Sequence, residues 1–339
     1  MNSYLEIAMH NRRIPMVNYL KGFSIATIVL MHLLDIMPFI PSRIITLSAI
    51  GGTGVHVFFL CSGIGLYYSH RCHPLSYGAF LKKRFLKIYT AYIPVIFLSF
   101  LLPWMYGESD RTAALLSHVF LFKMFIPRYE ESFGVQFWFV STLFQLYALF
   151  IPLCRLKDKL RRGELFVGVT LGISILWWIF CYFTAIDQYR IWGSFCLQYL
   201  WEFALGFVLA DAFYEEKTFR IKNYLLLIFA VAGIGLQAGL AMLSDTLKIF
   251  NDIPALLGYA SLALLCSNIP LINGLCRKVS VFSYELFLIH MLIFETTFHF
   301  AKPAGLLMAG FWGILSLLAA VFCAWFYHYI INRSVKKPA

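Results

Sequence analysis

Lys21 and His32 place a cation and a potential base within the first long apolar stretch of the chain, residues 16–38. On an α-helix their spacing returns to within about 20° of its start and advances about 16 Å along the axis. Both side chains would therefore lie on one face of one helix. Ionisable groups inside a membrane helix are costly unless they face a protein interior or a water-filled cavity, so the pair predicts a functional site.

The imidazole of His32 is the first candidate for a general base. Histidine is the side chain whose ordinary pKa lies closest to neutral pH, so its imidazole can take a proton from a substrate group. Asp35 follows one helical turn later, so its carboxylate is expected to orient the imidazole. Two structural alternatives stay open. His32 could be a packing residue, and Asp35 could mark the outer end of the helix.

The composition indicates the class of protein in which these residues lie. Hydrophobic residues make up 60% of the chain and charged residues 13%, and the mean hydropathy is +0.75. Soluble proteins carry roughly 25% charged residues. The sequence therefore predicts an all-α, polytopic integral membrane protein with about ten transmembrane helices. The expected spans are 16–38, 48–69, 86–105, 136–155, 165–185, 191–213, 222–243, 252–268, 280–300 and 306–331.

Basic residues indicate the orientation of these spans. With alternating spans, most of the 28 lysines and arginines fall on the side of the N-terminus, including Arg12, Arg13, Lys336 and Lys337. The positive-inside rule then places both termini in the cytoplasm, as short tails at 1–15 and 332–339. The net charge of +11 follows from this topology and favours contact with anionic membrane lipids. It does not indicate nucleic acid.

No feature of the sequence predicts a second domain or a metal. The eight cysteines contain no C-x-x-C pair and indicate neither a disulfide framework nor a zinc site. The longest external segment, 106–135, is too short for a soluble domain, and residues 112–125 are expected to form a helix at the membrane interface. The prediction is a single transmembrane domain over 1–339 without a metal.

Several segments resemble, in the expected order, the motifs of membrane acyltransferase family 3. They are Lys21 with His32, the run Gly51-Gly-Thr-Gly-Val-His-Val-Phe-Phe-Leu-Cys-Ser-Gly63, the run Phe80-Leu-Lys-Lys-Arg-Phe-Leu-Lys-Ile-Tyr89, the run Phe137-Trp-Phe-Val-Ser-Thr-Leu-Phe-Gln-Leu-Tyr147 and the run Ser283-Tyr-Glu-Leu-Phe-Leu-Ile-His290. Members of that family transfer acetyl or other acyl groups from acyl-CoA to surface glycans, antibiotics and lipids. The chain is most similar to the short subgroup without an appended esterase-like domain.

The resemblance implies a role for further residues. Lys21 stands where the family has an arginine, and Arg84 and Lys87 match its pair of arginines, so these three cations are expected to bind the phosphates of the donor. The resemblance also predicts that four side chains line the site, namely His56, Trp138, Tyr284 and His290. Here too alternatives stay open, because basic residues are common at any cytoplasmic boundary and a histidine can simply join two helices.

The sequence thus predicts a membrane acyltransferase of a bacterial cytoplasmic membrane. It would move an acyl group, most simply acetyl, from acyl-CoA to a hydroxyl of a cell-surface or secreted glycan or of a lipid-linked sugar. The alternative is a transporter that exports a polysaccharide or glycolipid precursor, because charged groups within about ten spans also fit a conduit. We find no inverted repeat in the sequence, and the ordered histidine and basic motifs favour the enzyme.

Overall fold

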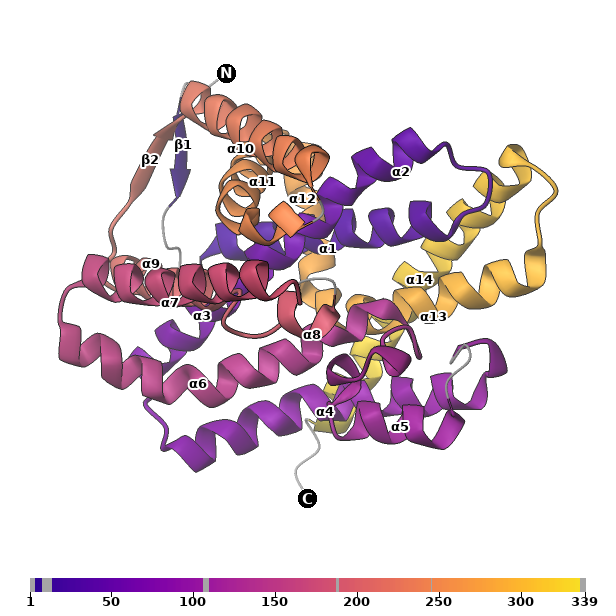
Figure 1. The fold of residues 1–339 in the computed structure, drawn as a ribbon, viewed down its shortest axis with the longest axis horizontal. Helices are drawn as coiled ribbons and strands as arrows, with labels where there is room; N and C mark the ends of the chain where they lie inside the picture. The colour runs from indigo at the N-terminus through magenta and orange to yellow at the C-terminus, as the bar shows by residue number, and fades with distance from the viewer. Residues whose placement is uncertain (1–3, 8–13, 106–109, 187–188, 245, 336–339) are drawn as a thin grey trace. The chain divides into compact units, whose positions relative to one another are not determined.

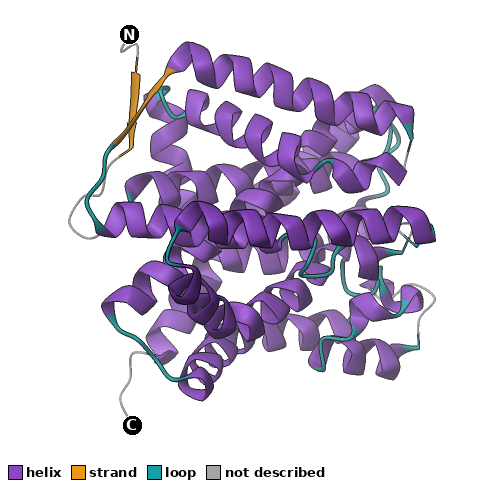
Figure 2. Ribbon diagram, turned by 60° about the vertical axis from the view of Figure 1, so that its left-hand side comes forward, coloured by secondary structure: helices purple, strands orange, loops and turns teal. Residues whose placement is uncertain are grey.

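The computed structural model describes residues 4–7, 14–105, 110–186, 189–244 and 246–335. Helices joined by short loops form nearly all of this part, with one pair of short strands (Figure 2). The predicted all-α class is confirmed. The basic tail residues Arg12, Arg13, Lys336 and Lys337 lie outside the described residues, and the cytoplasmic location of the termini stays a prediction.

Eight helical segments in the described part of the chain are long and apolar enough to cross a membrane. They are Pro15–Ile36, Ser42–Cys72, Tyr77–Leu101, Val135–Leu160, Gly163–Thr184, Asn223–Leu243, Pro270–Ala301 and Leu306–Arg333. The other two expected spans correspond to α9 (Leu200–Tyr214) and α11 (Asp252–Cys266), which have 15 residues each. Such a helix is about 22 Å long, less than the roughly 30 Å of a bilayer core. By length, the structure supports eight spans, and a count of ten stays a prediction.

The described chain divides into two compact units. Unit 1 comprises 1–24, 53–81 and 142–281, and unit 2 comprises 25–52, 82–141 and 282–339. Helix α1 (Pro15–Ile36) is continuous across the division between residues 24 and 25. The single domain expected from the sequence stays a prediction, and the two units are described separately.

Unit 1 is built around tight helix pairs (Figure 1). Helix α3 (Gly54–Cys72) packs along α9, and a Cβ on Gly63 would lie 2.1 Å from the Phe203 carbonyl oxygen. Only glycine permits this approach. Helix α10 (Asn223–Leu243) approaches α11 in the same way at Gly233 and Gly258. The remaining elements are most of α6 (Trp138–Leu160), whose first four residues belong to unit 2, together with α7 (Gly163–Thr184), α8 (Arg190–Gly193), α12 (Pro270–Val279) and the antiparallel strands β1 (Tyr4–Ile7) and β2 (Phe219–Lys222).

Unit 2 contains the second half of α1 and the C-terminal helix pair. Helix α13 (Ser283–Ala301) packs against α14 (Leu306–Val335), and the Tyr327 hydroxyl donates to the Ala91 carbonyl of α4 (Tyr77–Leu101) at 2.8 Å. The unit also holds α2 (Ser42–Ser48) and α5 (Arg111–Val119). The expected helix 112–125 is shorter in the structure, because it ends at Val119 and continues as single turns of 3₁₀ helix.

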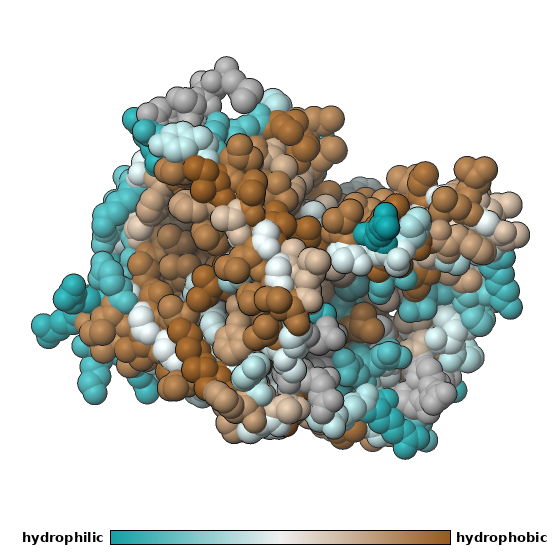
Figure 3. Space-filling view, turned by 45° about the horizontal axis from the view of Figure 1, so that its top comes forward, coloured by the Kyte–Doolittle hydropathy of each residue, from teal (hydrophilic) through white to brown (hydrophobic). Residues whose placement is uncertain are grey.

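Large apolar side chains cover much of the face shown in Figure 3. The most exposed large apolar side chains of the described residues include Phe183 of α7, Met242 of α10 and Leu307 of α14, which are 80%, 88% and 93% exposed. A soluble monomer rarely exposes large contiguous apolar patches, whereas lipid covers such side chains at no cost. This surface agrees with a multi-pass membrane protein.

Candidate active site

Helix α1 carries the first two candidate residues. Pro15 opens the helix at a position where its missing N–H is harmless, and a mainly apolar sequence follows. Lys21 and His32 are both half-buried, and Asp35 is exposed. The expected contribution of Asp35 to the orientation of the imidazole stays a prediction.

His32 is joined to His290 of α13 by a hydrogen bond within unit 2. His32 Nδ1 lies 2.9 Å from His290 Nε2, and the two ring planes are inclined by 15°. On its other side, His290 Nδ1 lies 2.9 Å from the carbonyl oxygen of Leu286. A carbonyl oxygen can only accept, so His290 Nδ1 carries a proton and donates it.

This arrangement fixes the tautomers of the neutral pair. With its proton on Nδ1, a neutral His290 presents a lone pair on Nε2, and His32 Nδ1 must donate to it. His32 Nε2 then keeps its own lone pair. The arrangement resembles the fixed imidazole of other sites in which one ring nitrogen is held by a hydrogen bond and the other is the reactive base. His290 is fully buried, so its orientation is set by packing.

Tyr284 joins α13, the helix of His290, to the helix that carries two of the predicted donor-binding residues. It lies on α13, and its hydroxyl donates to the Ile88 carbonyl of α4 at 3.3 Å. Helix α4 also carries Arg84, which is half-buried, and Lys87, which is exposed. His290 follows Tyr284 by six positions, which is about 9 Å along the helix. The imidazole of His290 therefore lies about 9 Å along α13 from the residue that contacts α4.

Trp138 is the first residue of α6, and buried polar groups stabilise the loop that precedes it. The Lys123 ammonium, only 2% exposed, donates to the carbonyls of Ser132 at 2.9 Å and Gly134 at 2.6 Å. His118 Nε2 donates to the Ser132 carbonyl at 2.9 Å, and His118 Nδ1 accepts from the Tyr92 hydroxyl at 2.9 Å. Burial, together with the positive charge of Lys123, lowers the pKa of His118 well below its usual value. This network positions the start of α6.

The comparison with known families decides the family of the chain. A family model described as an acyltransferase domain matches residues 14–330, nearly the whole chain. The chain belongs to acyltransferase family 3. The resemblance found in the sequence is therefore confirmed. No curated protein and no solved structure matches the chain.

The structure of this acyltransferase distributes the predicted site residues between the two units. Unit 2 holds His32, Asp35, Arg84, Lys87, Trp138, Tyr284 and His290. Lys21 and His56 belong to unit 1. Sequence reasoning did not foresee the His32–His290 bond, because the two residues are 258 positions apart. It also did not single out His118 and Lys123, which carry no recognisable motif.

His56 of the acyltransferase is part of a separate polar cluster. Its Nδ1 donates to Glu202 Oε1 at 2.6 Å, and Glu202 is fully buried. Asp252 lies beside this pair. The sequence predicts His56 to line the catalytic site, and this stays a prediction.

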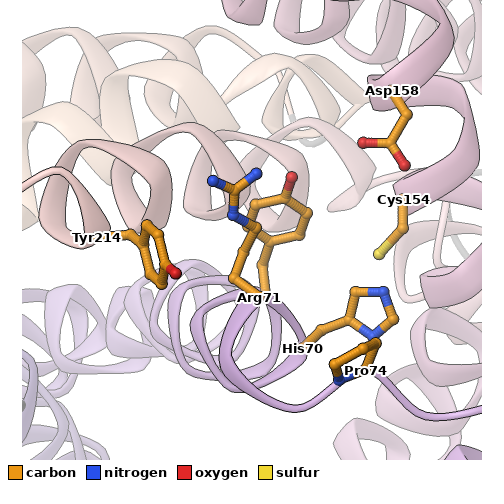
Figure 4. Close-up of a pocket in the computed structure, with 7 residues that line it drawn as sticks. His70, Arg71, Pro74, Cys154, Asp158 and Tyr214 are labelled. Carbon is orange, nitrogen blue, oxygen red and sulfur yellow. The ribbon is translucent and has the colours of Figure 1, made fainter.

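A pocket of about 270 Å³ lies in unit 1 of the acyltransferase. Figure 4 shows Arg71 between Tyr214 on one side and His70, Cys154 and Asp158 on the other. The Arg71 guanidinium lies 4.8 Å from the centre of the Tyr214 ring, and its Nε lies 3.6 Å from Asp211 Oδ1. Asp211 also pairs with Lys157. Acidic partners thus balance the cations here, so the pocket does not favour a phosphate, and we assign it no part in donor binding.

Proposed function

We propose that this acyltransferase moves an acetyl group from acetyl-CoA to a hydroxyl of a cell-surface or secreted glycan, with His32 as the general base. The observation that supports it most is the hydrogen bond from His32 Nδ1 to His290 Nε2, because it leaves His32 Nε2 as a basic nitrogen of defined direction. The proposal places the protein in a bacterial cytoplasmic membrane with both termini in the cytoplasm.

The proposed reaction needs two proton transfers, one to His32 and one from it. His32 Nε2 takes the proton of the acceptor hydroxyl while the hydroxyl oxygen attacks the thioester carbonyl. The tetrahedral intermediate then breaks its carbon–sulfur bond, and the imidazolium returns the proton to the leaving thiolate. The products are the acyl ester and free coenzyme A. His290 accepts a hydrogen bond throughout and keeps the imidazole in the required tautomer.

The donor is proposed to enter from the cytoplasm. Arg84 and Lys87 would contact its phosphates, since charge-assisted hydrogen bonds to phosphate are among the strongest that a protein makes. The position of His290 deeper along α13 than Tyr284 agrees with a thioester that lies beyond the nucleotide. Lys21, on the same helix as His32, is the third proposed donor contact.

The acceptor is proposed to be a sugar hydroxyl of a glycan or a lipid-linked sugar. Trp138 and Tyr284 would contribute aromatic surface to the site, and His56 is the fourth proposed lining residue. These roles rest on the family motifs and on the location of Trp138 and Tyr284 in the unit that holds the histidine pair.

A transfer assay in detergent tests this proposal. Purified protein is incubated with labelled acetyl-CoA and glycan acceptors, and labelled ester is measured; without sealed compartments, transport cannot produce a signal. We expect transfer by the wild-type protein and a loss of about 10²- to 10⁴-fold for His32→Ala. His299→Ala is the matched control, since His299 is exposed on α13. If no acceptor is labelled, while sealed vesicles export a glycan precursor without consuming acetyl-CoA, the chain is a transporter.

A further inference from the structure

Three side chains able to bind a metal converge in unit 1. They are His56 at the start of α3, Glu202 at the start of α9 and Asp252 at the start of α11. One potential ligand atom from each lies within 4.8 Å of the others. The three residues come from segments far apart in the chain, so the cluster is a product of the fold and not of a local motif.

The cluster contains oxygen atoms that lack a hydrogen-bond partner. Glu202 is fully buried and Asp252 is 5% exposed. Glu202 Oε1 accepts from His56, but Glu202 Oε2 and Asp252 Oδ2 have no partner within the described residues. Buried acceptors are normally satisfied, and each that is not needs an explanation. What these two oxygens lack is a positively charged or donating group.

Gln198 provides an independent indication from outside the cluster. Its side chain is 2% exposed, and its amide lies against the Asp252 carboxylate. The amide nitrogen donates to the Ile249 carbonyl at 3.0 Å, whereas Gln198 Oε1 has no partner in the described structure. A third buried oxygen without a donor thus belongs to a side chain that contacts Asp252.

With both carboxylates ionised, the charge balance of the cluster requires a further cation. Two carboxylates face each other here, and His56 is the basic side chain that contacts them in the described part of the chain. One imidazolium balances one carboxylate at most. A buried charge without compensation is strongly unfavourable, and buried charges in proteins are paired or coordinate metals. The positive ends of three helices also favour the ionised carboxylates, which is the form that binds a metal.

We propose that His56, Glu202 and Asp252 bind one divalent transition-metal ion, Zn²⁺ or Mn²⁺. A mixed set of one imidazole and several oxygens suits these ions. Ca²⁺ and Mg²⁺ are less suitable, because they prefer oxygen alone. The ion would join the N-terminal ends of α3, α9 and α11. This proposal replaces the sequence-based expectation of no metal.

Backbone packing holds the ligands in place before the ion binds. Gly63 and Gly206 bring α3 and α9 into direct backbone contact, which fixes His56 relative to Glu202. At the start of α3, a Cβ on Gly54 would lie 2.9 Å from the hydroxyl oxygen of Tyr259 on α11. A preformed site loses little freedom on binding, which favours affinity.

Metal analysis of the purified full-length protein tests the site. The protein is stripped with a chelator in detergent, dialysed against Zn²⁺ or Mn²⁺, and its metal content is measured by mass spectrometry. We expect saturable binding of one ion to the site and a rise in the unfolding temperature with metal concentration. Glu202→Gln and Asp252→Asn, which keep the side-chain shape, should lose both effects. Glu285→Gln is the matched control, because Glu285 pairs with His328 in unit 2.

A measurement on the wild-type protein covers the case in which the variants fail to fold. Pulsed electron paramagnetic resonance of the Mn²⁺-loaded protein should detect a coupled histidine nitrogen. Three results would each overturn the proposal. The wild-type protein could bind neither ion stoichiometrically, the variants could bind as much metal as wild type, or the bound Mn²⁺ could show no coupled nitrogen. None of these measurements depends on acyl transfer.

Discussion

His290 Nε2 accepts a hydrogen bond from His32 Nδ1 at 2.9 Å, although the two residues lie 258 positions apart in the chain. His290 is in turn held by the Leu286 carbonyl of its own helix. A backbone carbonyl thus determines, through one ring, which nitrogen of the other ring is basic. In this structure the positioning partner of the proposed base is a second neutral imidazole.

Replacing His290 tests this positioning role. His290→Phe removes the acceptor for His32 Nδ1–H and should lower kcat by about 10- to 100-fold, the usual effect of losing a group that orients a catalytic ligand or base. His290→Gln can offer an amide oxygen to the same proton and should restore part of the loss. The KM for the donor should change little in either variant. Equal kcat values for the two variants would show that the acceptor atom is unimportant.

Lys21 should tolerate a guanidinium and not an apolar side chain. Arginine presents several donors in a planar fork and binds a phosphate or carbonyl oxygen at least as well as an ammonium. Lys21→Arg should therefore retain transfer activity, and Lys21→Ala should lose most of it. The detergent assay measures both. Full activity of well-folded Lys21→Ala would remove Lys21 from the site.

Arg84 should act on the nucleotide part of the donor. Arg84→Glu introduces repulsion toward the phosphates and should raise the KM for acetyl-CoA by about tenfold or more, which corresponds to roughly 1.4 kcal/mol of binding. A short thioester donor without the nucleotide should be affected much less. Lys82→Glu, an exposed charge reversal on the same helix, controls for a general change of surface charge. Equal losses with both donors would indicate a structural role for Arg84.

His118 should make stability depend on pH. Its pKa in the folded protein lies well below the value of about 6.5 expected in the unfolded chain. Between these two values the unfolded state binds a proton that the folded state does not, so stability is lost as the pH falls below about 6.5. This single group contributes a slope of at most about 1.4 kcal/mol per pH unit.

The variant His118→Gln separates this effect from that of other titrating groups. It should be destabilised by about 1–3 kcal/mol at pH 7.5, because it loses a buried hydrogen-bonding ring. The difference from wild type should shrink as the pH is lowered toward 5, and thermal unfolding in detergent measures it. A constant difference over this range would mean that His118 does not titrate as described.

The sequence was sufficient for the fold class and for the family, because both depend on local signals. Apolar stretches such as 16–38 and 306–331 are long enough to be recognised individually, and Lys21 with His32 form a motif on a single helix. The lengths of α9 and α11 were harder to predict. Their apolar residues continue into neighbouring loops, and hydropathy alone does not locate the end of a helix.

Most polar contacts within the two sites could not be predicted from the sequence. His56 and Glu202 are 146 positions apart, and nothing local to either residue indicates the other. Asp252 looks like an ordinary residue at the start of a helix until α3 and α9 are seen beside α11. Such contacts are set by how helices pack, and a single sequence contains no direct record of that packing.

The strand pair has a practical consequence for work on this protein. Tyr4–Ile7 pairs in antiparallel register with Phe219–Lys222, so the backbone just before α10 is hydrogen-bonded to the first residues of the chain. Deleting residues 1–7 would leave Phe219–Lys222 as an unpaired β-edge, a structure that readily recruits other chains into aggregates. Expression tags and fluorescent fusions are therefore better attached at the C-terminus, where they leave this pairing intact.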